Sequence, residues 1–196
     1  MLGLIDESAP ESARGVHYVI GTAVLIDPTE KDEVRLRVRK LIGDRRRVFH
    51  WKGEGIELRT KMIDLLGELG VGVFAVIHRP VAARRQTVAR DASLRSLTSM
   101  LCREGVDNLL IESRGPQDAD DRRTLVDAIN GGDLPAALTY EFAGKDDALL
   151  WLPDAVAGVF GEAECRRSNR WIAELQRKAS VFEVRRLDAH EPRLPS

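Results

Sequence analysis

The sequence has little cysteine and no long apolar run. Its 196 residues include only Cys102 and Cys165, and no CxxC or Cys/His spacing indicates a zinc site. No apolar stretch approaches the roughly 18 residues that a membrane span needs. The N-terminus also lacks the basic region and apolar run of a signal peptide. We therefore expect a cytoplasmic protein without a membrane partner, whose cysteines are small buried residues in a reducing compartment.

Several well-known catalytic motifs are also missing. The chain contains no P-loop, GxGxxG, GxSxG or HExxH sequence. Their absence argues against Walker-type nucleotide hydrolysis, dinucleotide oxidoreduction, serine hydrolysis and zinc-protease chemistry.

An excess of charge of one sign is absent too. The formal net charge is -1, with 30 basic against 31 acidic residues, so there is no global signal for nucleic acid or an anionic membrane. The basic residues are mostly arginine, 24 against 6 lysines. Arginine suits bidentate phosphate contacts, but codon bias in a GC-rich genome explains the same excess.

Apolar segments with strand character alternate with segments of helical periodicity. The expected strands cover 2–6, 17–26, 71–78, 106–112 and 134–142, and residues 181–188 are a final strand or an extended tail. The expected helices cover 34–42, 56–70, 84–104, 118–130 and 149–167. Residues 34–42 also alternate like a strand, but the Asp-Pro start signal before them and the glycine after them favour a helix. Residues 45–51 are a further candidate strand.

This alternation predicts a single α/β domain with a mixed or mostly parallel sheet flanked by helices. We expect the domain to span residues 1–188 and to be followed by a loose tail, 189–196. The first four expected strands should lie in one sheet.

Acidic residues stand at strand and helix ends, where sites gather in open α/β sheets. Asp6 and Glu7 end the first apolar run, Glu112 ends the fourth expected strand, and Asp154 opens a late helix. Asp6 and Glu7 cannot both face one side of a strand, and we favour Asp6 for the site. Each acid has a structural alternative: a turn, a solvated strand end, or a partner of the helix dipole.

If these acids converge, they suit phosphoryl transfer. Magnesium and manganese prefer oxygen ligands, and two such ions stabilise a transferring phosphoryl group and activate a water. The small residues Ala157, Gly158 and Gly161 would let the late helix pack close to the sheet and hold Asp154 near the strand ends.

A short segment before the second expected helix carries further candidates. His50 could shuttle protons near neutral pH, or it could be a packing residue between Phe49 and Trp51. Trp51 and Lys52 could stack on a base and meet a phosphate. The basic run of Arg45, Arg46 and Arg47 should border any nucleic-acid groove.

With these residues identified, the chain resembles the domain-of-unknown-function 3800 family, a large group of uncharacterised prokaryotic proteins with a ribonuclease H-like fold. The resemblance is spread over about residues 2–165. It is carried in order by the segments LIDES, YVIGTAVLI, FHWKGE, LLIES and LPDAVAGVF.

The resemblance implies a ribonuclease H-like sheet with Asp6, Glu112 and Asp154 in an acidic cluster. It also matches His50 to a frequent histidine and makes Glu54 a further candidate acid, beside Glu7. The chain has Glu112 where ribonuclease H-like enzymes more often have Asp, and the extra methylene changes the reach toward a metal.

Two functions follow as hypotheses. The first is a nuclease or related phosphoryl-transfer enzyme that uses Mg²⁺ or Mn²⁺ at a carboxylate cluster to act on nucleic acid. The alternative is a catalytically inert ribonuclease H-like module that binds a protein or nucleic acid. Fold alone does not separate them.

Overall fold

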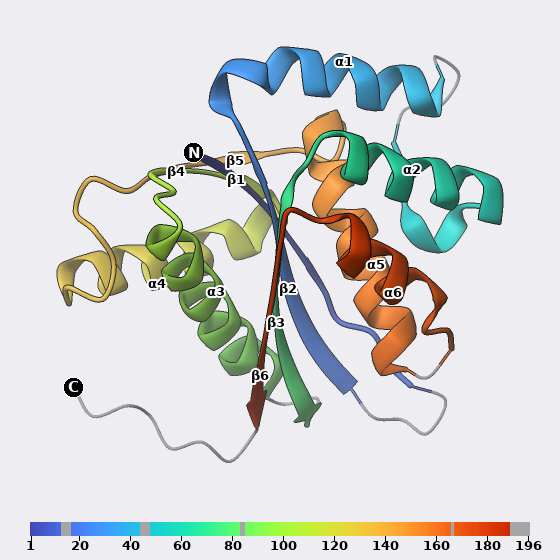
Figure 1. Ribbon diagram of the computed structural model, residues 1–196. Coiled ribbons are helices and arrows are strands. Elements are labelled where there is room, and N and C mark those ends of the chain that lie inside the picture. The colour runs from blue at the N-terminus through green and yellow to red at the C-terminus, as the bar shows by residue number, and fades with distance from the viewer. Residues whose placement is uncertain (13–16, 44–47, 83–84, 166, 189–196) are drawn as a thin grey trace.

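The computed structural model describes residues 1–12, 17–43, 48–82, 85–165 and 167–188 (Figure 1). The basic run 45–47 and the expected tail 189–196 lie outside these ranges. Within them, no helix combines the length and the apolar character needed to cross a lipid bilayer. Both cysteines are free thiols, Cys165 buried and Cys102 half-buried.

A single mixed sheet organises the chain. Its order is β5-β4-β1-β2-β3-β6. The strands are β1 (Leu2–Ser8), β2 (His17–Ile26), β3 (Gly72–Val81), β4 (Asn108–Glu112), β5 (Thr139–Ala143) and β6 (Val181–Asp188). The first three form an antiparallel meander, β4 and β5 continue the sheet parallel to β1, and β6 lies parallel to β3. This arrangement confirms the predicted mixed sheet flanked by helices, including the placement of the first four expected strands in one sheet.

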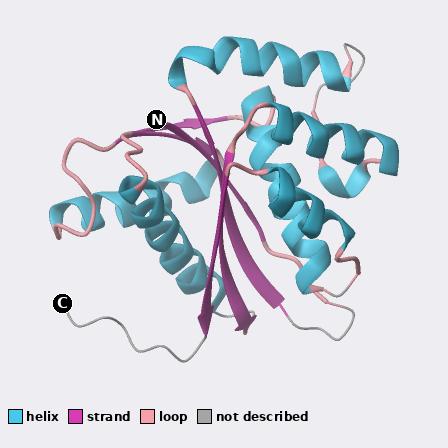
Figure 2. Cartoon of the chain, viewed as in Figure 1, coloured by secondary structure: helices cyan, strands magenta, loops and turns pink. Residues whose placement is uncertain are grey.

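Helices cover both faces of the sheet (Figure 2). The helices are α1 (Lys31–Ile42), α2 (Ile56–Glu68), α3 (Gln86–Arg103), α4 (Asp118–Asn130), α5 (Trp151–Glu164) and α6 (Arg170–Lys178). On one side lie α3 and α4, and on the other lie α1, α2, α5 and α6 (Figure 1). Each side therefore has its own hydrophobic core.

The alternation of side chains along β1 separates these two cores. Leu4 belongs to the core beneath α5, whereas Ile5 belongs to the core beneath α3. Because successive strand residues point to opposite faces, the next two residues, Asp6 and Glu7, must also face opposite ways. This alternation decides which acid can join a site beside α5.

Most differences from the expected elements lie near turns. Residues 34–42 are helical, as favoured, and Asp27 accepts a hydrogen bond from the Thr29 backbone N–H at the preceding turn. The candidate strand 45–51 is not found in its described part, because residues 48–50 are irregular and a 3₁₀ turn, η2 (Trp51–Gly53), follows. The strand expected at 134–142 begins only at Thr139, and the sequence patterns did not predict α6.

Candidate functional site

The parallel pairing of β1 and β4 brings two acids to one edge of the sheet. Ile5 pairs with Ile111, so Asp6 and Glu112 follow at neighbouring positions on the two strands. Both side chains lie on the face opposite Ile5 and Ile111, which is the α5 face. Asp6 is 6% exposed and Glu112 9% exposed, so both carboxylates are removed from most of the solvent.

Asp154 comes to this edge from the first turn of α5. The buried Thr22 on β2 holds this turn to the sheet, because its hydroxyl donates to the Pro153 carbonyl at 3.0 Å. Thr22 also lies opposite Asp6 in the pairing of β1 with β2. The start of α5 is therefore fixed beside Asp6.

Both carboxylate oxygens of Asp154 have partners. Its Oδ2 accepts the Trp51 backbone N–H at 2.8 Å, and its Oδ1 lies 3.0 Å from Nδ1 of His50. The Asp154 side chain is 15% exposed and that of His50 62% exposed. Asp154 thus anchors the turn before α2 to α5, which is a more specific structural role than a partner of the helix dipole. The exposure of the His50 side chain excludes it as a core packing residue.

The electrostatics of Asp6 show that the three acids act on one another. Burial raises the pKa of Asp6 well above its usual value, and the charges of Glu112 and Asp154 raise it further. Two smaller influences oppose the rise: the Glu7 backbone N–H, which donates to Asp6 Oδ1 at 2.6 Å, and the charge of Lys145. Acids from three separate segments therefore influence one another's charge, and their role as a metal site stays a prediction.

Lys145 is a residue of this site that sequence reasoning missed. Its ammonium lies 3.1 Å from Glu112 Oε1. The hydrogen bond and the charge of Glu112 raise the pKa of Lys145, and Asp6 and Asp154 add to the rise. Lys145 follows β5, so it lies at the carboxyl end of another parallel strand, and that position was the signal available in the sequence.

The donor chemistry of this site suits a divalent metal ion, but the side-chain positions do not form a ready metal cage. Carboxylate oxygens are the ligands that Mg²⁺ and Mn²⁺ prefer. Over the described ranges, however, no three His, Cys, Asp or Glu side chains are grouped closely enough to hold one ion. Glu112 faces Lys145, and Asp154 is held by His50 and Trp51. A metal would have to draw these two side chains away from their present partners.

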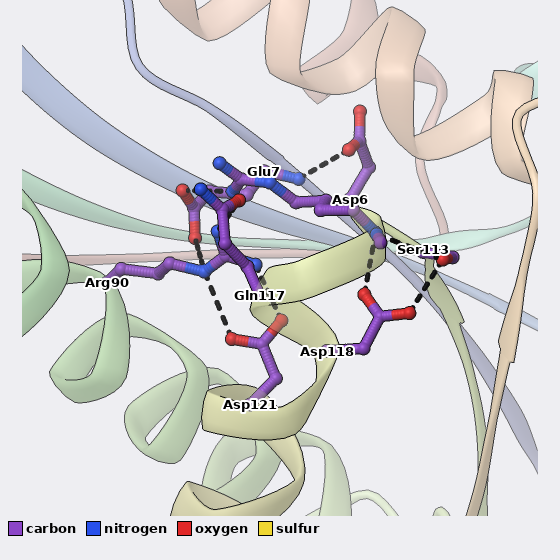
Figure 3. Close-up of polar contacts among 9 residues, drawn as sticks. Asp6, Glu7, Arg90, Ser113, Gln117, Asp118 and Asp121 are labelled. Carbon is purple, nitrogen blue, oxygen red and sulfur yellow. Dashed lines mark hydrogen bonds and ion pairs between the residues drawn. The ribbon is translucent and has the colours of Figure 1, made fainter.

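Glu7 does not join this site. It points to the α3 and α4 side of the sheet, away from Asp6 (Figure 3). There its carboxylate lies 2.7 Å from Arg114 and 3.2 Å from Arg90, and Arg90 also pairs with the buried Asp121. Asp6 and Glu7 therefore face opposite sides of the sheet, and Asp6 is the one on the same side as Glu112.

The remaining sequence candidates lie around the η2 turn. Lys52 is exposed and Glu54 is half-buried, with the Glu54 backbone N–H closing the turn onto the Trp51 carbonyl at 3.1 Å. The prediction that Trp51 stacks on a base is wrong, because its side chain is 1% exposed. The predicted groove residues Arg45, Arg46 and Arg47 are outside the described ranges.

The small-residue face of α5 contacts the η2 turn and the loop after β1. A Cβ added to Gly158 would lie 2.2 Å from the Trp51 ring, whereas one added to Gly161 would meet Pro10 at 3.6 Å. The absence of a side chain at Gly158 therefore makes room for Trp51. This close approach brings the η2 turn, and His50 with it, next to Asp154.

Comparison with known proteins gives no match to a family model and no match to a curated protein. The chain is similar to a chain in the structure of the PCNA:RNase HII complex from Archaeoglobus fulgidus, with 15% identity and a TM-score of 0.48, covering 98% of this chain and 84% of that one. It is also similar to ribonuclease H2 from Pyrococcus horikoshii, with 17% identity and a TM-score of 0.40, covering 91% and 77%. The fold is therefore described from its own strand order and not from these two similarities. Membership of the domain-of-unknown-function 3800 family stays a prediction.

Proposed function

We propose that this protein cleaves the phosphodiester backbone of nucleic acid, using Mg²⁺ or Mn²⁺ held by Asp6, Glu112 and Asp154. The observation that carries the proposal is the coupling of these acids: Asp6 is buried at a strand end, and the other two raise its pKa. The charges of Glu112 and Asp154 oppose the ionisation of Asp6, and a bound divalent cation would offset that repulsion. Buried acids that disfavour one another's ionised form are common at functional sites.

The chain itself would contribute positioning and proton transfer. The Glu7 backbone N–H orients the Asp6 carboxylate, and Asp154 orients His50 through Nδ1. A carboxylate at Nδ1 favours the tautomer whose Nε2 accepts a proton, and the exposed His50 ring can reach a water or a leaving oxygen. The ion, when bound, would neutralise charge on the phosphoryl group and lower the pKa of a bound water.

One observation favours the alternative, a catalytically inert binding module. Lys145 already provides a cation to Glu112, and both oxygens of Asp154 are engaged. If these contacts persist in the presence of metal, the acids serve the fold and not catalysis.

The test combines metal-dependent stability with cleavage. We expect Mn²⁺ at 100 times its dissociation constant to stabilise the parent protein by about 2.7 kcal/mol, because it binds only the folded state. Thermal melts with Mn²⁺ and with a chelator measure this gain, and labelled RNA, DNA and RNA–DNA hybrid measure cleavage. Asp6→Asn and Glu112→Gln should lose both the gain and the cleavage.

The matched control is Asp120→Asn, which removes a carboxylate on α4 whose side chain is 55% exposed. It should keep the parent's metal response and activity. A parent protein that neither responds to metal nor cleaves any of the three substrates would establish the inert module instead.

A further inference from the structure

A recess of about 170 Å³ lies among the same segments that carry Asp6, His50 and Asp154. Three segments form its walls: the end of β1 with Ser8, the η2 turn with Trp51 and Lys52, and the face of α5 around Gly158. Each wall contains a residue that lies within four positions along the chain of a residue of the site. Ser8 is on the same side of β1 as Asp6, Trp51 follows His50, and Gly158 is one helical turn after Asp154.

The recess has cationic side chains on its wall and rim. Lys52, Arg59 and Arg167 line it, against the single carboxylate of Glu162. Arg59 lies 2.7 Å from Glu162 and neutralises it, which leaves Lys52 and Arg167 as the unbalanced charges of the lining. The Arg167 guanidinium also donates to the Glu11 carbonyl at 3.2 Å, and this contact leaves its charge uncompensated.

Lys52 and Arg167 lie close enough together that the charges of both influence the Cys165 thiol. Burial raises the pKa of the Cys165 thiol, and the charges of Arg167 and Lys52 both oppose that rise. Lys52 comes from the η2 turn and Arg167 from the segment after α5, so the tertiary structure brings them together beside the recess. Two adjacent cations favour an anion between them.

The size and the apolar part of the lining restrict the occupant. Drug-sized ligands and cofactors occupy roughly 300–1,000 Å³, which exceeds the space here. The lining also includes Pro10, Ala157 and Gly161, which carry no charge. A phosphate with its attached sugar matches this combination in size, charge and polarity.

We propose that this recess is a subsite for a nucleic-acid backbone, in which Lys52 and Arg167 bind the phosphate next to the one at the carboxylate site and the sugar lies on Pro10 and Gly161. The inference rests on the proposed function, which supplies the strand, and it adds how that strand is held. The contacts are to phosphate and sugar, so the subsite selects a polynucleotide without reading its bases.

The test measures binding without catalysis. The probe is a fluorescein-labelled single-stranded DNA of mixed sequence, titrated in chelator over a range of salt concentrations. Each neutralised phosphate contributes about 0.7 to the salt slope on a single strand. Because Lys52 and Arg167 bind the same phosphate, Lys52→Ala/Arg167→Ala should lower the slope by about 0.7 and weaken binding roughly fivefold at 0.1 M salt. An abasic oligonucleotide should show the same loss, because the sugar and phosphate remain.

The matched control is Arg103→Ala/Arg123→Ala, which removes two exposed cations from α3 and α4 on the other side of the sheet. It should keep the parent's slope. An unchanged slope in the Lys52/Arg167 variant, or a loss confined to DNA with bases, would overturn the subsite even if the parent cleaves nucleic acid. Binding with the expected slope but without metal-dependent cleavage would overturn the proposed function and leave the subsite in a binding module.

Discussion

Asp6 and Glu7 are neighbours on β1, yet the charged residues around them shift their pKa values in opposite directions. Asp6 is buried and Glu7 half-buried, and burial raises the pKa of each carboxylate. On the α3 and α4 side, the charges of Arg90 and Arg114 oppose that rise for Glu7. On the α5 side, Glu112 and Asp154 increase the rise for Asp6.

The difference separates a structural ion network from a candidate site. The side chain of Arg90 is 11% exposed and joins Glu7 to Asp121, so β1 is tied to α3 and α4 by paired charges (Figure 3). The acids beside α5 have Lys145 as a cationic neighbour, and its side chain is 65% exposed. The ion network on the α3 and α4 side holds β1 in place. On the α5 side, the Glu7 backbone N–H donates to Asp6 and orients its carboxylate.

The largest effect on stability should come from breaking the ion network on the α3 and α4 side. Arg90→Met would leave the half-buried Glu7 and the buried Asp121 without their shared cation, and such a loss typically costs about 3–5 kcal/mol. Urea unfolding at neutral pH measures the change in the free energy of unfolding. Arg123→Ala, which removes an arginine whose side chain is 71% exposed, should change stability by less than about 0.5 kcal/mol. Equal small effects of the two substitutions would show that the network contributes nothing to stability.

Substituting the two neighbouring acids should change stability by different amounts. Asp6→Asn should stabilise the metal-free protein at neutral pH, because it removes an ionised carboxylate that burial, Glu112 and Asp154 all disfavour. Glu7→Gln should stabilise it less, because the charges of Arg90 and Arg114 oppose the effect of burial on Glu7.

The pH dependence identifies the cause for Asp6. A raised folded-state pKa means that the folded protein holds the proton longer than the unfolded chain, so stability falls as pH rises from the ordinary Asp pKa to the folded one. The gain in Asp6→Asn should therefore vanish below the ordinary pKa, grow through that window and stay constant above it. Unfolding curves in urea between about pH 4 and 8 measure this, and a gain that is independent of pH would contradict the electrostatic explanation.

The smallest effect on stability should come from removing Lys145, the cation beside Glu112 on the α5 side. Lys145→Met would delete a largely exposed pair with Glu112, so its cost in stability should stay below about 1 kcal/mol. The same change should tighten Mn²⁺ binding by up to about fivefold, since 1 kcal/mol corresponds to that ratio and Lys145 opposes a second cation. Calorimetric titration of Mn²⁺ into parent and variant tests this expectation. Lys31→Met is the control, because Lys31 pairs with Glu141, an exposed acid that is not among the coupled ones. Weaker Mn²⁺ binding in the Lys145 variant would indicate that the lysine supports the metal site.

Local patterns predicted much of the sheet and the opposite directions of Asp6 and Glu7. Apolar β-branched runs predicted β2, β3 and β4, and the two-residue period of a strand separated Asp6 from Glu7. The parallel placement of β1 and β4, expected from the alternation of strands and helices, brought Glu112 beside Asp6. These features depend on neighbours in the chain or on the general geometry of α/β folds, so a single sequence carries them.

The partners of these acids depended on tertiary packing. Lys145 meets Glu112, Arg90 meets Glu7 and Asp121, and Trp51 packs onto Gly158, although each pair comes from different elements. A base-stacking role for Trp51 was plausible from its neighbours His50 and Lys52, but the missing side chain at Gly158 buries the ring.

The sequence by itself determined the alternation of elements, the opposite faces of Asp6 and Glu7, and the placement of acids at strand ends, because these follow from backbone periodicity. Only the tertiary structure decided which acids are paired with arginine and which remain coupled without a full set of cations. It also decided that Lys52 and Arg167 share one recess. The physical reason is that charge balance and cavity shape depend on distances between residues far apart in the chain, and no local pattern encodes those distances.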